Sequence, residues 1–455
     1  FQWLGPSEVA VRLPAFVICL ASLPLFWHVT RRLLSPLGHT LAVAIFSVSI
    51  WPATMGALVK PYAFDLFVSL GMTALFVEWL RDTERRAWLV ALILALPLAM
   101  MASYPAVFVA GGIGAVLMAE AWQRRDRGIL ALGMVYGVVL VVSFGGHYLL
   151  VGMRHLNSPV AGVTTAVGMD QYWSNAFPPL NPFKAVLWFF LVHTGQMAAY
   201  PLGAASGGSI LTASLALVGL VVLVRQGHGR VVGVILVTFG LWFLASLLRK
   251  YPYGLSCRLS QHVAAFYCLT AGMGAAAIIL RLTSDHRKLV ATLGVCGVLA
   301  TIGLGGSVRD FLYPYRELKA LEARQKITAW LGTVGSEPIY RVGPEGYMDC
   351  LPSWYLGLYR GPLFVADLNQ GLRPGADTTV FWVFAIGDDY PDQTRIDMAL
   401  GGSQSAWMCV ERRVFLFQNP GLRAPVFRCQ AFRYVRNLEG DPQLTRFQGE
   451  AESPP

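Results

Sequence analysis

The residues that could do chemistry gather first in the stretch from Val59 to Asp65, which reads VKPYAFD. It sets a cation (Lys60), an aromatic hydroxyl (Tyr62) and a carboxylate (Asp65) between two apolar runs. An aspartate near the middle of a membrane helix costs roughly 2.5–3.5 kcal/mol on insertion scales, so charge at a helix mouth needs a reason. If a helix starts at Pro61, Tyr62 and Asp65 share one face. The alternative stays open: a snorkelling lysine, an interfacial tyrosine and an aspartate favoured at a helix start.

A second group of such residues is Arg249 to Arg258, RKYPYGLSCR. Arg249, Lys250 and Arg258 place three cations in one short loop, beside the aromatic Tyr251. The planar fork of an arginine matches phosphate oxygens, so a lipid phosphate is a natural partner. Cations held by headgroups without a specific site are the alternative interpretation.

The composition predicts which elements position these groups. The chain has 455 residues, of which 55% are hydrophobic and 14% charged, where a soluble domain has about 25% charged residues. Up to Val308 there are 20 Lys+Arg against 9 Asp+Glu, a net +11, whereas Arg309 to Pro455 has 16 against 17, a net −1. The basic balance therefore belongs to the apolar part. It indicates loop topology and membrane lipids, and argues against nucleic acid as a partner.

Ten apolar runs predict a polytopic α-helical membrane protein. They are residues 10–30, 37–57, 62–80, 87–102, 105–121, 129–151, 209–225, 230–248, 259–281 and 289–307. Thirteen basic residues lie in every second loop: Arg31, Arg32, Arg81, Arg85, Arg86, Arg124, Arg125, Arg127, Arg225, Arg230, Arg281, Arg287 and Lys288. By the positive-inside rule these loops are cytoplasmic, so the loops with Lys60 and Arg249, and both termini, face outward. The alternation requires a turn, not a kink, at Ser103-Tyr104-Pro105.

The rest of the chain predicts smaller elements. Residues 183–192 lie in a long outward loop and are too short to span, so we expect them at the interface. From Asp310 onward the pattern changes to a helix over 315–331, with a stripe of Leu318, Leu321, Ile327 and Leu331. Short β-rich runs follow at 338–342, 379–386, 414–417 and 426–434. We predict a transmembrane domain over 1–308, a C-terminal soluble α/β domain over 309–437 and a disordered tail over 438–455.

Cysteines and soluble-enzyme motifs add little. No pair of the seven cysteines has CxxC spacing, and nothing in the sequence singles out a metal cluster or a cofactor site. Cys409 and Cys429 are a candidate disulfide if the tail is extracytoplasmic. No GxSxG, HExxH, P-loop or dinucleotide fingerprint is present.

Three motifs in order resemble a known family. Ser7 to Pro14 reads SEVAVRLP before an apolar helix, Val59 to Asp65 opens another, and Tyr251-Pro252-Tyr253-Gly254 precedes Arg258. This looks like the bacterial membrane glycosyltransferases of the GT-C superfamily, relatives of protein O-mannosyltransferases and aminoarabinose transferases. Their members carry an E-x-x-x-R-L-P opening and a K/R-P-Y loop. The resemblance covers about residues 3–307.

The resemblance implies an activity and a location. Such enzymes move a sugar from a polyprenyl-phosphate carrier to an acceptor at the outer face of the membrane. It implies a multi-pass protein of the bacterial inner membrane with the C-terminal domain outside. Arg249, Lys250 and Arg258 would bind the carrier phosphate, and Tyr62 and Tyr251 would also contact the substrate. Lys60 would help with phosphate or acceptor, and Asp65 would orient Lys60 or Tyr62, or act as the base.

The chain departs from this family in two places. The family's base sits in a first outward loop, and this chain begins beyond that position, which we interpret as a truncated start or a degenerate member. Leu58 stands where many relatives have an acidic residue. A transporter or flippase, for which buried charges and broken helices are expected, and a non-catalytic receptor displaying the tail are the competing hypotheses.

Overall fold

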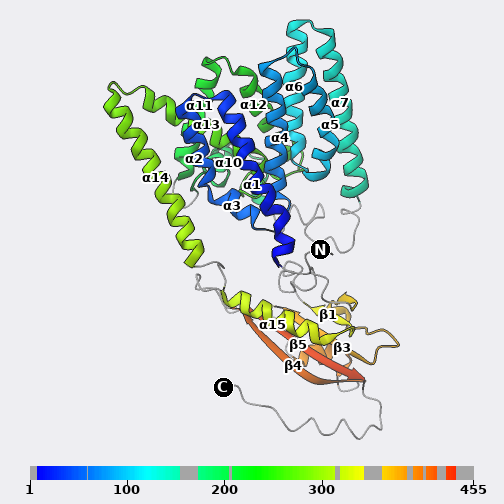
Figure 1. Cartoon of the computed structure of the whole chain (residues 1–455). Coiled ribbons are helices and arrows are strands. Elements are labelled where there is room, and N and C mark those ends of the chain that lie inside the picture. Colours follow the sequence, from blue (N-terminus) through cyan, green and yellow to red (C-terminus); the bar gives the residue numbers. More distant parts are fainter. Residues whose placement is uncertain are drawn as a thin grey trace. The chain divides into compact units, whose positions relative to one another are not determined.

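The computed structural model describes two compact units (Figure 1). The membrane unit is Val9–Leu312, and the C-terminal unit is Tyr313–Pro455 together with Phe1–Glu8. The residues described are 8–58, 60–153, 173–203, 208–312, 318–342, 361–386, 393–402, 406–417 and 427–436.

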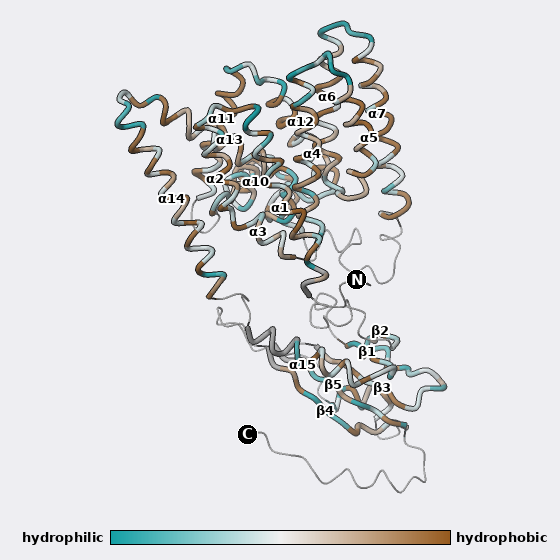
Figure 2. Tube along the Cα trace, viewed as in Figure 1, coloured by the Kyte–Doolittle hydropathy of each residue, from teal (hydrophilic) through white to brown (hydrophobic). Residues whose placement is uncertain are grey.

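The membrane unit is helical throughout its described residues. Its α-helices are α1 (Glu8–Leu33), α2 (Pro36–Ser47), α3 (Ile50–Gly56), α4 (Tyr62–Arg81), α5 (Ala87–Ala102), α6 (Ala106–Arg124), α7 (Arg127–His147), α10 (Pro182–Thr194), α11 (Gly208–Arg225), α12 (Gly229–Leu247), α13 (Gln261–Leu280) and α14 (Asp285–Leu312). Short helical turns occupy Tyr148–Gly152, Ser174–Ala176 and Gln196–Ala198. Eight helices are long and apolar enough to cross a membrane, or nine if the bent pair α2–α3 is one span. Figure 2 shows their hydrophobic residues in brown. The polytopic helical fold is thus confirmed.

The apolar run 37–57 forms two helices rather than one continuous helix. The run breaks between Ser47 and Ile50, and α2 and α3 are bent by 50°. Pro52 explains the break, because it has no N–H to donate to the carbonyl of Val48 and its ring clashes with that carbonyl in a continuous helix. The other nine runs each correspond to one helix, of which α5 is shorter than a span.

Ser103–Pro105 forms the predicted turn. α5 ends at Ala102 and α6 begins at Ala106, and both helices pack against α4 and against α7. Two consecutive helices that share both neighbours run side by side, as Figure 1 shows. The alternation of loops deduced from the basic residues therefore holds across this point.

Helix α13 lies at the centre of the membrane unit, with 83% of its spanning window buried. It packs mainly on α11 and α2. The contact with α11 is backbone to backbone: a Cβ on Gly219 would meet the Thr270 carbonyl oxygen at 1.8 Å, and one on Gly274 would meet the Leu215 carbonyl oxygen at 2.0 Å. Small residues permit such close approach between membrane helices.

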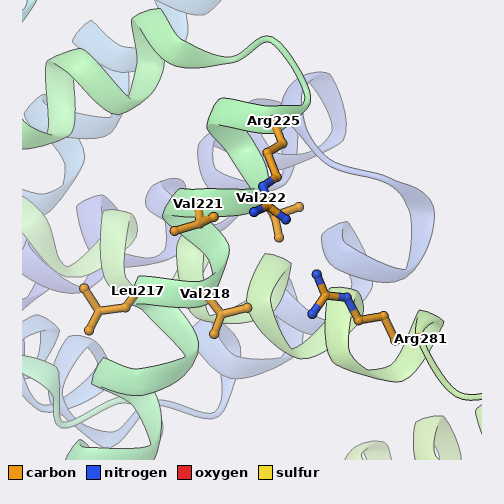
Figure 3. A pocket seen from close by; sticks show the side chains of 6 residues that line it. All are labelled: Leu217, Val218, Val221, Val222, Arg225 and Arg281. Carbon is orange, nitrogen blue, oxygen red and sulfur yellow. The ribbon is translucent and has the colours of Figure 1, made fainter.

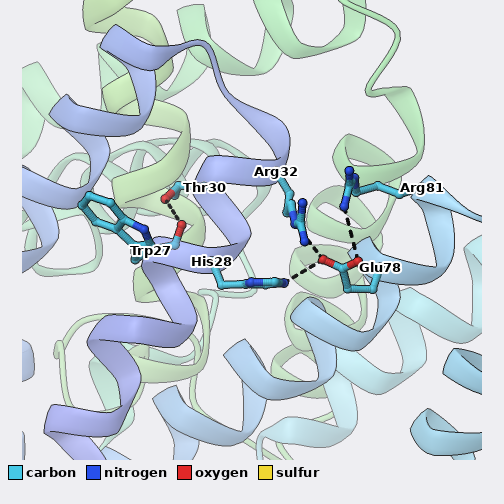
Figure 4. Close-up of polar contacts among 6 residues, drawn as sticks. All are labelled: Trp27, His28, Thr30, Arg32, Glu78 and Arg81. Carbon is cyan, nitrogen blue, oxygen red and sulfur yellow. Dashed lines mark hydrogen bonds and ion pairs between the residues drawn. The ribbon is translucent and has the colours of Figure 1, made fainter.

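Charged residues of the loops predicted to be cytoplasmic meet in ion pairs. Glu78 near the end of α4 accepts from His28 at 2.7 Å, Arg32 at 2.9 Å and Arg81 at 3.5 Å (Figure 4). Glu120 of α6 is 3% exposed and pairs with Arg124 and, at 2.6 Å, with Arg230 of α12. These pairs join α1 to α4 and α6 to α12 at one end of the unit, which we call the Glu78 end.

The C-terminal unit holds a mixed five-stranded sheet of order β2-β1-β3-β5-β4. Its strands are β1 (Ile339–Val342), β2 (Leu363–Val365), β3 (Val380–Ile386), β4 (Trp407–Phe417) and β5 (Phe427–Arg436). β1 pairs in parallel with β2 and β3, whereas β5 is antiparallel to β3 and β4. Helix α15 (Leu318–Val334) packs on one face through Ile327, Trp330 and Leu331. On the other face pack Leu372 and, from helix α17 (Gln393–Ala399), Ile396.

The predicted α/β character is confirmed, with corrections to its elements. β1, β3 and β5 match the predicted runs within two residues, but β4 begins at Trp407, seven residues before the predicted Val414. The charged residues Glu411, Arg412 and Arg413 interrupt the apolar pattern of β4. An edge strand such as β4 tolerates charged residues. β2 and α17 were missed because three and seven residues are too short for a periodic signal. The predicted tail 438–455 lies outside the described residues.

Cys409 and Cys429 are both free, so the candidate disulfide is wrong. Cys429 lies opposite Phe415 and Cys409 lies opposite Tyr434 in the β4–β5 ladder. The two cysteines are therefore five rungs apart along β5, about 17 Å at strand spacing. A disulfide needs Cα atoms within about 7 Å.

Candidate active site

Helix α4 begins where the sequence predicts. Pro61 precedes its first residue, Tyr62, and has helical dihedrals (φ −71°, ψ 0°). Tyr62 is half-buried and Lys60 is exposed, whereas Asp65 in the first turn is 5% exposed. Val59 lies outside the described residues. The end of the membrane unit that carries these residues is called the Lys60 end.

The buried Asp65 is held by a residue that the sequence analysis did not assign. Ser103 donates its hydroxyl to Asp65 Oδ1 at 2.7 Å, and Ser103 Oγ accepts from the Ala106 N–H at 3.2 Å. Ser103 thus bonds the first residue of α6 and a residue in the first turn of α4 at once. A serine just before a helix start was the available signal. Asp65 accepts this bond from Ser103, and its orientation of Lys60 or Tyr62 stays a prediction.

Tyr251 joins this group from the loop between α12 and α13. Its ring stacks on Tyr104 with centroids 5.9 Å apart and meets the edge of Phe108 at 5.5 Å. Burial, together with the nearby Asp65, raises the pKa of Tyr251 well above its usual range. The phenol therefore stays protonated and can donate a hydrogen bond.

The cations of the predicted site separate into two groups. Arg258 is exposed and lies within electrostatic range of the Tyr62 hydroxyl. Arg249 instead places its guanidinium 5.5 Å from the Phe177 ring, and its φ of 53° marks a turn. Among the described residues, no hydrogen bond or ion pair holds the exposed side chains of Lys60 and Lys250. The structure thus brings Tyr62, Asp65, Tyr251 and Arg258 together, and directs Arg249 elsewhere.

The 249–258 loop is fixed by residues that the sequence analysis missed. The Tyr253 hydroxyl lies 3.0 Å from His193 Nε2, and the other ring nitrogen of His193 lies 2.8 Å from the Tyr267 hydroxyl. The Tyr253 N–H donates to the Ala176 carbonyl at 2.8 Å. Gly254 has a φ of 65°, and a Cβ there would meet Val192 at 2.3 Å. Burial and glycine geometry therefore set the position of Tyr251 and Arg258.

A shallow cavity of about 380 Å³ lies at the other end of the unit (Figure 3). Its apolar wall is α11, and the side chains of Arg225 and Arg281 lean toward it. Both arginines belong to loops predicted to be cytoplasmic, and none of the predicted site residues lines this cavity. Within the described part of the chain, no three His, Cys, Asp or Glu side chains form a group that could hold a metal ion.

Comparison with known proteins agrees with this architecture. Residues 1–146 match the model of the dolichyl-phosphate-mannose-protein mannosyltransferase family. The fold is similar to the crystal structure of apo ArnT from Cupriavidus metallidurans, with a TM-score of 0.53 and 14% identity over 93% of this chain and 83% of that one. A weaker likeness, with a TM-score of 0.46 and 10% identity, is to the Archaeoglobus fulgidus oligosaccharyltransferase AglB in complex with an inhibitory peptide and a dolichol-phosphate. It covers 83% of this chain and 58% of that one. The comparison with curated proteins gives no match.

The family match and the shared fold together support one class of protein. The chain has the multi-pass membrane fold of the GT-C glycosyltransferases, and its first third matches a family of that superfamily. The family match includes the motifs around Arg12 and Lys60, and the fold agrees with the resemblance to the superfamily.

Proposed function

We propose that the protein transfers a sugar from a polyprenyl-phosphate carrier to an acceptor at the outer face of the bacterial inner membrane. The observation that carries the proposal is the match of residues 1–146, which include Lys60 and Asp65, to the dolichyl-phosphate-mannose-protein mannosyltransferase family. Tyr62, Asp65, Tyr251 and Arg258, which meet at the Lys60 end, support it.

The transfer needs charge stabilisation at the leaving group. The acceptor attacks the anomeric carbon, the bond from that carbon to the phosphate oxygen breaks, and the carrier leaves as polyprenyl phosphate. Negative charge grows on the phosphate, so cations and hydrogen-bond donors aimed at it lower the barrier. In this proposal Arg258 and Lys60 bind the phosphate, with Lys250 at the rim. The protonated Tyr251 and Tyr62 hydroxyls donate to it.

Asp65 takes a positioning role in this mechanism. Its burial and its bond from Ser103 connect the starts of α4 and α6, and so fix Tyr62 and Tyr104. A base exposed to the acceptor would remove the proton from the attacking group. Arg249 is left out of the phosphate site, because its guanidinium lies over Phe177.

The test is sugar transfer in membranes that contain the protein and a radiolabelled polyprenyl-phosphate sugar. Lys60→Ala and Arg258→Ala should each lower the rate by roughly 100- to 1000-fold, the range for losing one charge-stabilising group. Arg249→Ala should change it by less than about threefold, because its guanidinium does not face the phosphate.

Arg287→Ala is the matched control, since it removes an exposed arginine from a loop predicted to be cytoplasmic. Transfer that survives both Lys60→Ala and Arg258→Ala would contradict the assigned site. If the protein neither binds nor consumes any lipid-linked sugar, the enzyme proposal fails and a transporter or receptor takes its place.

A further inference from the structure

The C-terminal unit contains a buried cation that has no ion-pair partner among the described residues. Arg341 of β1 is 4% exposed, and neither its Nε nor its Nη1 has a hydrogen-bond partner. A buried, uncompensated charge costs several kcal/mol. A core position of a strand that needed only packing would carry an apolar residue, so the guanidinium is a candidate for binding a partner of opposite charge.

A second unpartnered donor lies on the same face of the sheet. The Nε1 of Trp330 in α15 is buried and has no acceptor. Its ring stacks on Phe384 with centroids 5.5 Å apart, and Phe384 is the residue opposite Arg341 in the β1–β3 ladder. Arg341 and Trp330 therefore both offer hydrogen-bond donors beside Phe384. Neither side chain has an acceptor.

Among the described residues, a carboxylate before β1 is already engaged. Glu337, just before β1, pairs with Arg433 at 2.5 Å and accepts from Trp382 Nε1 at 2.6 Å. Trp382 pairs with Ile339, and Arg433 pairs with Trp382. Ile339 lies two residues before Arg341 and therefore on the same face of the sheet. The donors of Arg341 and Trp330 thus remain for a ligand with several acceptor oxygens.

The topology puts these donors where open sheets bind ligands. Arg341 is the residue before the last of β1, and Phe384 lies near the end of the parallel neighbour β3. In the sheet, β2 lies on one side of β1, and β3, β5 and β4 lie on the other side. The carboxyl ends of β1 and β3 therefore flank a topological switch point, the place where such sheets bind ligands.

We propose that the C-terminal unit binds a phosphate monoester at the carboxyl ends of β1 and β3, through Arg341 and Trp330. A guanidinium binds phosphate oxygens in a planar fork, and the remaining oxygens of a tetrahedral anion can accept from an indole on another element. Soluble phosphate monoesters and lipid headgroups share this chemistry, and the test distinguishes them. The site is formed by residues of the C-terminal unit and does not rest on the proposed transferase activity.

The test is hydrogen–deuterium exchange of the whole protein in phosphatidylcholine nanodiscs. Three phosphate sources are compared at constant ionic strength: inorganic phosphate, glycerol 3-phosphate, and nanodiscs in which part of the lipid is phosphatidic acid. We expect at least one source to slow exchange in β1 and β3 by about tenfold or more. Protection by the soluble phosphates indicates a soluble ligand, and protection by phosphatidic acid alone indicates a headgroup.

Arg341→Met separates binding from a structural role. It should abolish the protection, and without phosphate it should leave exchange in β1 equal to or slower than in the native protein, because an uncompensated charge has been removed. The control is Arg436→Met on β5, which removes an arginine bonded to the Ala376 carbonyl at 3.1 Å and should keep the protection. The proposal is overturned if no phosphate source protects β1, if protection survives Arg341→Met, or if that change alone speeds exchange.

Discussion

At the scale of the residue, the Asp65 carboxylate decides between two mechanisms. Its bond from Ser103 and its 5% exposure suit a group that positions its neighbours. A general base must instead reach the proton that it removes, and its loss costs about 10²- to 10⁴-fold in rate. The two roles differ in whether the charge of Asp65 or only its acceptor oxygen is required.

Asp65→Asn separates these roles, because the amide oxygen can still accept from Ser103. For a positioning residue we expect the substitution to keep the transfer rate within a few-fold. Asp65→Ala and Ser103→Ala should each lower it by roughly 5- to 150-fold, because a buried partner left unsatisfied costs about 1–3 kcal/mol. The rate is measured in the lipid-linked sugar assay. A drop of 10³-fold or more in Asp65→Asn, with activity kept in Ser103→Ala, would make Asp65 the base.

Sequence reasoning found the residues of the site better than their partners. Lys60, Tyr62 and Asp65 stand out because charge is rare beside apolar runs, and Tyr251 and Arg258 because they share a basic, aromatic loop. Hydrogen bonds across sequence distance leave no local signal. Ser103 lies 38 residues from Asp65, and His193 lies 60 from Tyr253, so neither contact could be predicted.

At the scale of the element, α13 depends on glycines at its contact with α11. Gly219 and Gly274 each face a carbonyl oxygen of the other helix, so a methyl group at either position has no flexible side chain to displace. The helices would have to move apart along a contact that buries most of α13. Side chains on α13 position the loop residue Tyr253 through His193, so the change would reach the Lys60 end.

Gly219→Ala and Gly274→Ala should therefore each destabilise the protein by about 1–3 kcal/mol or more, the cost of overpacking. The measurement is the midpoint of thermal unfolding in detergent. Gly240→Ala on α12 is the matched control, because a Cβ there meets nothing within 4 Å, and alanine has the higher helix propensity. Equal midpoints for all three variants would show that α11 and α13 do not pack this closely.

Hydropathy predicts where the membrane helices lie, whereas single residues such as proline determine where a helix breaks. Nine of the ten runs correspond to single helices, whereas the run with Pro52 became α2 and α3. The missing N–H of that proline was visible in the sequence, but the average hydropathy of the run concealed it. In the C-terminal unit, the predicted run began only at Val414 because Glu411, Arg412 and Arg413 interrupt the apolar pattern. Their pairing with β5 shows that they belong to an edge strand.

At the scale of the molecule, the two ends of the membrane unit differ in whether their cations are paired with carboxylates. At the Glu78 end, carboxylates from α4 and α6 pair with arginines from α1 and α12. At the Lys60 end, Lys60, Lys250 and Arg258 are exposed cations, and among the described residues no ion pair engages them. The arginines of the Glu78 end suit a cytoplasmic loop. The cations of the Lys60 end suit the binding of an anion such as a phosphate.

The last prediction concerns which end faces outward, because the proposed transfer at the outer face requires the Lys60 end there. Single cysteines are introduced at Lys60 and Leu255, and at Thr83 and Gln226 on the opposite side, in a protein whose seven native cysteines are replaced. A membrane-impermeant maleimide added to intact spheroplasts should label the first pair at once, and the second pair only after permeabilisation. The basic loops near Arg85 and Arg225 give this orientation by the positive-inside rule. The inverse pattern would place Arg258 in the cytoplasm, and the sugar would then have to come from a donor on that side.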